Sequence, residues 1–315
     1  MDSKVGDAIK RLIDNIEQVI FGKREVVKLC VTGLLARGHL LIEDIPGIGK
    51  TTLAQGLARS IHCTFTRIQF TSDMLPSDII GVSILNPKTS EFEFRQGPIF
   101  AHIVLADEVN RTPPKTQSAL LEAMSECRVS VDGVSRPVPQ PFMVLATQNP
   151  IEYEGTYILP ESQLDRFMLR VEIGYPPTED ELRIMRRRDP IRALEQLQPV
   201  LTAADVIGLQ DQVGHVRVED SVARYMLAVT QGTRRHDHIQ LGASPRASLS
   251  LYEACQARAL VEGRDFVTPG DVKQMAVPVL SHRVLVKSRS GDLVSAARER
   301  ARSIVEVVNS IPVPV

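Results

Sequence analysis

A glycine-rich turn between an apolar run and a helical pattern constrains the fold of this chain more than any other feature. Residues 39–43 form the apolar run, residues 52–58 have helical spacing, and the turn joins them. Glycines in such a turn adopt positive φ angles, so that backbone N–H groups and the helix N-terminus surround an anion. The sequence therefore predicts a phosphate-binding loop made of Pro46, Gly47, Ile48, Gly49, Lys50, Thr51 and Thr52.

Two side chains of this loop suit a nucleotide. Lys50 supplies a positive charge for the β- and γ-phosphates, and the hydroxyl of Thr51 suits Mg²⁺. The strict pattern for such loops has glycine at position 44, where this chain has Asp44. The alternative interpretation is a loop that only ends a strand and leaves Lys50 in solvent.

Apolar runs alternate with helical patterns in the first half of the chain. Runs at 39–43, 65–70, 102–106, 142–147 and 168–173 resemble buried parallel strands, and helical stretches such as 51–61 and 114–127 separate most of them. This alternation predicts a three-layer α/β domain with a parallel sheet.

The pattern changes after residues 175–177, which read Tyr-Pro-Pro. Helical patterns then occupy about 178–189, 202–213, 219–231, 245–262 and 268–281, and no strand-like run follows. We predict an α/β domain over residues 1–178 and a smaller all-helical domain over 179–315. Residues 311–315 should pack loosely.

Composition narrows the class of protein. The chain has 315 residues and 43% hydrophobic content, enough for a sizeable core, and a net charge of −1 gives no bulk attraction to nucleic acid. Its four cysteines are scattered without a C-x-x-C spacing, which argues against a zinc or disulfide framework. Residues 1–7 do not resemble a signal peptide and no apolar run approaches a membrane span, so we expect a cytoplasmic protein.

A pair of acids closes the strand at 102–106. Asp107, at the carboxyl end of that strand, can hold Mg²⁺ beside the phosphate loop, and Glu108 can orient and deprotonate a water molecule. Two solvated acids at the end of a strand are the alternative. The phosphate loop upstream favours a single nucleotide-hydrolysing site.

Three further polar residues are candidates for the same site. Asn149 follows the strand at 142–147 and can sense the γ-phosphate, although a residue before proline is otherwise typical of a turn. Arg166 is either a surface ion-pair partner or an arginine finger for a neighbouring subunit. Arg246 sits in the first turn of a helix, where the helix dipole disfavours it, so a phosphate or an interdomain carboxylate would explain it.

With these residues in place, the chain resembles the MoxR family of AAA+ ATPases over nearly its whole length. The AAA+ likeness rests on the phosphate loop, the acid pair, Asn149, Arg166 and Arg246, in the family's order. The MoxR likeness rests on longer stretches at 105–111, 113–124, 146–150 and 154–157. The resemblance implies a P-loop AAA+ core followed by an all-α lid domain.

The resemblance also implies Mg²⁺-dependent hydrolysis of ATP to ADP and phosphate. Lys50 and Thr51 would bind phosphate and Mg²⁺, Asp107 would coordinate Mg²⁺, and Glu108 would be the catalytic base. Asp44 is the visible departure from the pattern.

Other implied roles concern residues outside the loop. Asn149 would be the first sensor, Arg246 the second sensor, and Arg166 a finger acting in trans. Residues 20–22, with Phe21 and Gly22, would lie near the adenine. A finger from a neighbour requires a ring, usually a hexamer.

Two insertions carry family character. Residues 81–98 contain a turn followed by an alternating stretch and resemble the helix-2 insert hairpin, and residues 129–138 form a second hairpin around an Asp-Gly turn. Both are plausible substrate levers in a ring pore. Simple decoration of the sheet is the alternative.

The leading functional interpretation is a chaperone-like remodeller. Members of the resembled family act with proteins bearing von Willebrand factor A domains, often in metal-cofactor insertion or complex maturation, so such a partner and a protein client are expected here. A nucleic-acid motor or loader and a nucleotide-binding ring scaffold are alternatives. The near-neutral charge disfavours the first, and the intact Glu108 and Arg166 disfavour the second. A small-molecule kinase would leave Asn149 and Arg246 without an obvious role.

Overall fold

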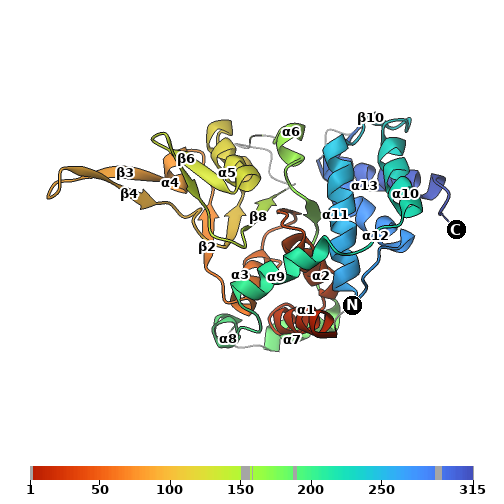
Figure 1. Cartoon of the computed structure of the whole chain (residues 1–315), viewed down its shortest axis with the longest axis horizontal. Coiled ribbons are helices and arrows are strands. Elements are labelled where there is room, and N and C mark those ends of the chain that lie inside the picture. Colours follow the sequence, from red (N-terminus) through yellow and green to blue (C-terminus); the bar gives the residue numbers. More distant parts are fainter. Residues whose placement is uncertain (1–2, 150–156, 158, 187–189, 288–292, 315) are drawn as a thin grey trace.

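The structure, a computed structural model, describes residues 3–149, 157, 159–186, 190–287 and 293–314. Five parallel strands form the central sheet of the N-terminal part, in the order β2-β5-β8-β1-β9 (Figure 1). All five predicted strands are therefore confirmed. Their bounds are β1 Leu40–Glu43, β2 Phe65–Gln69, β5 Ile103–Asp107, β8 Met143–Gln148 and β9 Leu169–Val171.

Residues of β1, β5 and β8 alternate between two hydrophobic clusters, one on each face of the sheet, which makes the domain three-layered. Leu40 and Ile42 of β1 join the cluster containing α1, α2 and α3, whereas Leu41 joins the cluster containing α4 and α5. This period of two is the pleat of a strand buried on both faces. The helices are α1 Ser3–Ile16, α2 Arg24–Leu35, α3 Lys50–Ser60, α4 Pro76–Ile80 and α5 Pro114–Glu126.

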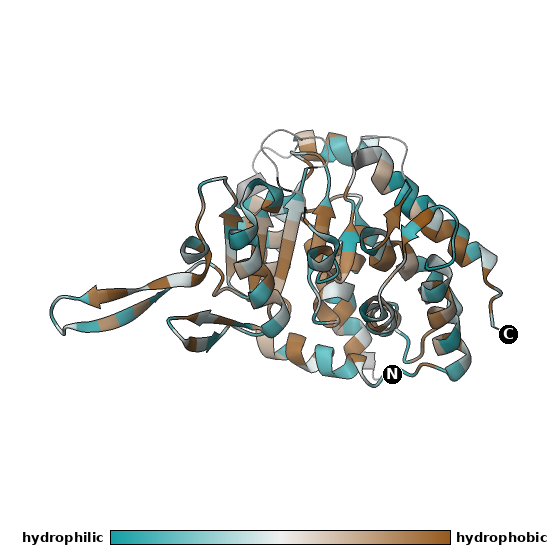
Figure 2. Cartoon of the chain, turned by 90° about the horizontal axis from the view of Figure 1, so that it is seen from above, coloured by the Kyte–Doolittle hydropathy of each residue, from teal (hydrophilic) through white to brown (hydrophobic). Residues whose placement is uncertain are grey.

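Both predicted hairpins are present as antiparallel pairs. β3 (Gly81–Asn86) pairs with β4 (Glu91–Gln96), and β6 (Arg128–Val131) pairs with β7 (Val134–Pro137). The β3–β4 hairpin extends well away from the sheet as an arm (Figures 1 and 2). At its base Gly81 has a φ of 94°, and a Cβ there would lie 2.2 Å from the Arg95 carbonyl oxygen, so only glycine fits.

The C-terminal part is almost entirely helical, as expected. Capping boxes start α9 and α12, where Thr202 and Thr268 each accept an N–H three residues on. The sequence did not predict α8, α13 or the two strands of a short antiparallel pair. The bounds are α7 Thr178–Arg186, α8 Pro190–Gln196, α9 Ala203–Val213, α10 Asp220–Thr233, β10 Ile239–Leu241, α11 Pro245–Val261, α12 Pro269–Leu280, β11 Leu285–Val286 and α13 Leu293–Ser310.

The C-terminal helices pack directly on the α/β part. One hydrophobic cluster contains residues of α1, α2, β1 and β9 together with residues of α9 to α13. Nε2 of His282 lies 2.8 Å from the carbonyl oxygen of Phe167, and Arg283 is buried beside Asp165 at 3.2 Å. Because the core is continuous here, the domain boundary at 178/179 stays a prediction. No described helix is long and apolar enough to cross a bilayer.

Candidate nucleotide site

A cavity of about 320 Å³ lies at the carboxyl ends of β1, β5 and β8, beside the N-terminus of α3. Parallel sheets bind ligands at this edge because their loops and helix N-termini converge there. The structure thus brings together nearly all of the predicted loop with Asp107, Glu108 and Asn149. Its lining residues are Pro46, Gly47, Gly49, Lys50, Thr51, Thr52, Arg67, Asp107, Glu108 and Asn149.

The loop has the backbone that a phosphate site needs. Gly47 and Gly49 have φ angles of 84° and 93°, and Gly49 is the residue before α3. A Cβ on Gly47 would meet nothing within 4 Å, so the positive φ, and not crowding, accounts for glycine there. The first N–H groups of α3 have no partner within the helix, and Lys50, Thr51 and Thr52 of that first turn line the cavity, which favours an anion.

Lys50 is held by the loop itself. Its Nζ donates a hydrogen bond to the Asp44 carbonyl oxygen at 2.6 Å. Burial lowers the pKa of Lys50, while the carboxylates of Asp107, Asp44 and Glu108 act in the opposite direction. The lysine therefore stands among acids near the phosphate position, where a phosphate can replace the carbonyl as its acceptor.

Asp44 ties the loop to the segment that follows the neighbouring edge strand, β9. Its Oδ2 accepts the N–H groups of Ile173 and Gly174, both at 2.7 Å, and its Oδ1 accepts the N–H of Ile45 at 2.8 Å. The side chain is buried. The departure from the glycine pattern is thus a carboxylate with three backbone donors, fixed between the phosphate loop and the segment that leads into α7.

The two acids at the end of β5 share one hydroxyl. Thr147 Oγ1 donates to Asp107 Oδ1 at 2.5 Å and accepts the Glu108 N–H at 2.9 Å. Asp107 Oδ2 also pairs with Arg67 at 2.6 Å. Glu108 has a φ of 59°, an uncommon conformation for a residue with a side chain, and such strain clusters at functional sites.

The Glu108 carboxylate is occupied by neighbours of its own chain. Its Oε2 accepts from Gln69 Nε2 at 2.8 Å and pairs with Arg111 at 3.0 Å. Arg67, Gln69, Arg111 and Thr147 were missed by the sequence reasoning. The signal for Gln69 was its place at the end of a strand beside the acids, since it pairs in register with Asp107.

The two predicted arginines lie outside this cavity, and we call them the arginine face. Arg166 donates to the carbonyl oxygen of Leu121 at 2.9 Å and to the Ser125 hydroxyl, and it lines a separate cavity with Glu122 and Glu126. Arg246 is exposed in the first turn of α11. The cap of that helix, Ser244, donates to Asp165 at 3.1 Å. Neither arginine is among the described residues that line the phosphate cavity.

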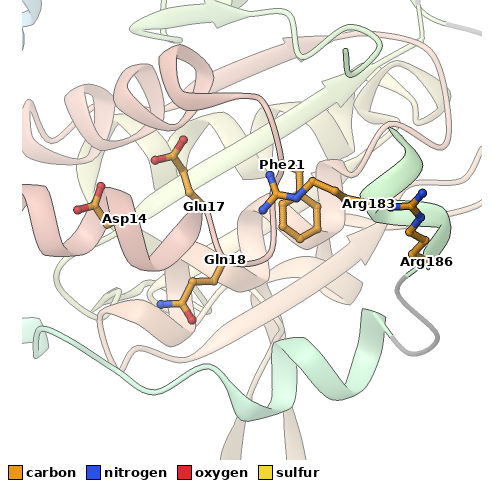
Figure 3. A pocket seen from close by; sticks show the side chains of 6 residues that line it. All are labelled: Asp14, Glu17, Gln18, Phe21, Arg183 and Arg186. Carbon is orange, nitrogen blue, oxygen red and sulfur yellow. The ribbon is translucent and has the colours of Figure 1, made fainter. Parts of the chain in front are cut away.

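Residues 20–22 bridge the loop and α7. A Cβ on Gly49 would lie 3.5 Å from Ile20, and one on Gly22 would overlap Asp180 of α7. The Phe21 ring faces elsewhere: the Arg183 guanidinium lies 4.6 Å from its centroid, in a separate cavity lined by Asp14, Glu17, Gln18, Phe21, Arg183 and Arg186 (Figure 3). The Ile20 side chain is therefore next to the phosphate loop, whereas the Phe21 ring lines the other cavity. Of the motif 154–157, only Tyr157 is among the described residues.

Comparison with known proteins agrees with this geometry. Residues 39–169 match the family described as ATPase family associated with various cellular activities (AAA), and residues 231–306 match the AAA lid domain. Chaperone MoxR1 of Mycobacterium tuberculosis is 41% identical, over 88% of this chain and 76% of the relative. The uncharacterized protein YeaC of Bacillus subtilis is 48% identical, over 97% and 94%.

A solved structure shows the same architecture. A crystal structure of an ATPase candidate from Cytophaga hutchinsonii superposes with a TM-score of 0.88 at 36% identity, covering 99% of this chain and 96% of the other. The parallel sheet, the phosphate loop and the helical C-terminal part define an AAA+ ATPase with its lid. Within that class, the chain belongs to the MoxR family and is an ATPase of the MoxR chaperone type.

Proposed function

We propose that the chain is an ATP-driven remodelling chaperone that works as a ring, with each active site shared between two subunits. The observation that carries the proposal is the separation of the site. The phosphate loop and the acids line one cavity, while Arg166 is hydrogen-bonded to α5 outside it. A finger arginine acts on phosphate that a neighbouring subunit holds. The separation therefore supports assembly as a condition for full activity.

The residues present fit ATP with Mg²⁺. The loop offers backbone N–H groups and Lys50 for phosphate, and a hydroxyl and a carboxylate, Thr51 and Asp107, lie in the same cavity as cation ligands. When bound, Mg²⁺ would neutralise charge on the β- and γ-phosphates. Asp107 now pairs with Arg67, so this arginine must yield or turn to phosphate as the ligand enters.

Glu108 would take a proton from the attacking water, and Asn149 would orient that water or contact the γ-phosphate. Because Gln69 and Arg111 hold the Glu108 carboxylate, the base is restrained until these contacts change. Gln69 ends β2, and α4 begins seven residues later at Pro76 and leads directly into the β3–β4 arm. A movement of the arm can in this way be coupled to release of the base.

The arm would contact the client. Its strands expose apolar side chains, with exposed fractions of 40% for Val82, 41% for Ile84, 52% for Leu85 and 74% for Phe92. Exposed apolar groups of this kind are typical of protein contact surfaces. We propose a protein client, a partner with a von Willebrand factor A domain, and a role in cofactor insertion or complex maturation, in the cytoplasm.

The decisive experiment measures ATPase rate against protein concentration, with mass by light scattering, in the presence and absence of ATP and Mg²⁺. Specific activity should rise as rings form. Mixing Arg166→Ala with Glu108→Gln subunits should restore activity, since each leaves a different half of a shared site intact. A fully active monomer, with a rate independent of concentration, would refute the shared site.

A further inference from the structure

Three side chains with metal-ligand chemistry converge far from the nucleotide cavity, where the α10–β10 turn meets the last helix. His236 and His238 lie in that turn and Glu306 lies on α13, and one ligand atom from each lies within 4.8 Å of the others. His236 Nε2 is 3.5 Å from Glu306 Oε2. We propose that this trio binds one divalent transition-metal ion, with zinc as the best match.

The donor set selects the kind of ion. Two imidazoles and one carboxylate are a known zinc combination that leaves a fourth position for solvent. Imidazole also suits copper and nickel, whereas Mg²⁺ and Ca²⁺ prefer oxygen ligands and need more of them. The Mg²⁺ that accompanies ATP is therefore a weak competitor at this site.

Neighbouring contacts hold the ligands near their places. The His236 carbonyl accepts the Ile239 N–H at 3.0 Å, and the His238 carbonyl accepts the Lys287 N–H at 2.9 Å, which fixes the turn against β11. Glu306 projects from α13, whose Ile304 and Val307 are buried. Its Oε1 accepts from Arg302 at 2.9 Å, so that Oε2 faces His236.

Only small movements are needed to close the site. Zinc–ligand bonds of about 2 Å place ligand atoms about 3.3 Å apart, closer than the present limit of 4.8 Å. His238 is exposed and its side chain can turn. His236 Nδ1 accepts a long hydrogen bond, 3.4 Å, from the His238 N–H. When metal replaces the proton on Nε2, the proton moves to Nδ1 and only this long contact is lost.

The charges set the expected strength. Glu306 supplies one negative charge, which Arg302 partly offsets, and Lys287 lies close by with its Nζ on the Asp237 carbonyl. We therefore expect micromolar affinity and not the tighter binding of a thiolate site. A bound ion would fasten α13 to the α10–β10 turn and so stabilise the end of the lid.

The test is calorimetric titration of the untagged chain with zinc sulfate in excess Mg²⁺. We expect one equivalent of zinc per chain, at least tenfold weaker affinity in His238→Ala and in Glu306→Gln, and unchanged affinity in the control His215→Ala, an exposed histidine after α9. Co²⁺, followed by visible absorption, should report a coordination number of four or five with the same dependence on the variants.

A second readout separates binding from misfolding. Without zinc the variants should have the wild-type thermal midpoint, because both side chains are at the surface. Zinc at a concentration that saturates the wild type should raise the wild-type midpoint by several degrees, as binding to the folded state alone requires, and should raise that of His238→Ala clearly less. Failure to saturate at one equivalent, or equal binding by wild type and both variants, would overturn the proposal.

Discussion

The nucleotide cavity and the arginine face differ in how their polar groups are partnered. Inside the cavity, Asp107 and Glu108 are satisfied by neighbours from their own chain, including Thr147 and Gln69. On the arginine face, Arg246 is exposed, and the hydrogen bonds of Arg166 go to a carbonyl and a hydroxyl, although Glu122 and Glu126 line the same cavity. A guanidinium whose described hydrogen bonds go to neutral acceptors can still bind an anion that arrives from outside. The contrast supports two halves of one site that meet only between subunits.

Removing the finger should have the largest effect. Arg166→Ala should lower the ATPase rate by about 10³- to 10⁵-fold, the usual contribution of an arginine finger. Nucleotide affinity of the isolated chain should not change, because the cavity lies elsewhere. Steady-state phosphate release and nucleotide titration measure the two quantities. Arg224→Ala, an exposed arginine of α10, is the matched control. A tenfold loss of affinity would place Arg166 in its own subunit's site.

Glu108→Gln tests the other side of the comparison. We expect the rate to fall by about 10²- to 10⁴-fold, as for loss of a general base, with ATP binding retained and the assembled state accumulating. Glutamine keeps the contact with Gln69 but cannot take a proton. Lys50→Ala should instead lose ATP binding. Single-turnover measurements separate the two, and wild-type turnover in Glu108→Gln would remove the base assignment.

The sequence predicted the cavity well because its parts are contiguous motifs at strand ends. The glycines, Lys50 and the acid pair are each recognisable from a few neighbouring residues, and the period of the apolar runs located the strands. Contacts that depend on strand register were not predictable in this way. Gln69 meets Glu108 only because β2 pairs with β5.

The contacts of Asp44 were also not predictable from the sequence. In the sequence it was a departure from a pattern, since its two main donors lie about 130 positions along the chain at Ile173 and Gly174. The short β10–β11 pair was missed because three- and two-residue strands have no periodicity to detect. Helix α13 was missed although its buried residues, including Ile304 and Val307, have helical spacing.

Lowering the pH should destabilise the segments around the arginine face before it destabilises the nucleotide cavity. His39 accepts the Val144 N–H at 3.0 Å, and its Nε2 lies 2.9 Å from the Met124 carbonyl on α5, the helix to which Arg166 donates its hydrogen bonds. Burial lowers the pKa of His39 to about 4, and burial also lowers that of His282, which contacts Phe167. The folded protein therefore holds both imidazoles in their neutral form.

Protonation of these two histidines favours the unfolded chain, because their pKa values are higher there than in the folded protein. Above pH 6.5 both imidazoles are neutral in the folded and in the unfolded chain, so their contribution to the free energy of unfolding is constant. As the pH falls from 6.5 toward 4, the unfolded chain takes up protons first, and His39 alone removes up to about 3 kcal/mol. Urea midpoints at several pH values measure this, and NMR should show His39 neutral down to near pH 4. Hydrogen exchange should rise first in α5 and at 165–167. Earlier exchange in the phosphate loop would reverse the comparison.

Asp44→Asn should have the smallest effect, and it tests how the cavity is fixed to the segment that leads into α7. The amide presents only one acceptor, so its NH₂ group must face at least one of the N–H donors now held by the carboxylate. We expect about tenfold weaker ATP binding, since one charge-assisted hydrogen bond is worth about 1.5–3 kcal/mol, and little change in the rate at saturation. Asp44→Gly restores the usual glycine but removes the tie, so it should weaken binding equally. If Asp44→Gly bound ATP as wild type does, the tie to Ile173 and Gly174 would have no part in shaping the loop, and the loop geometry would come from its glycines alone.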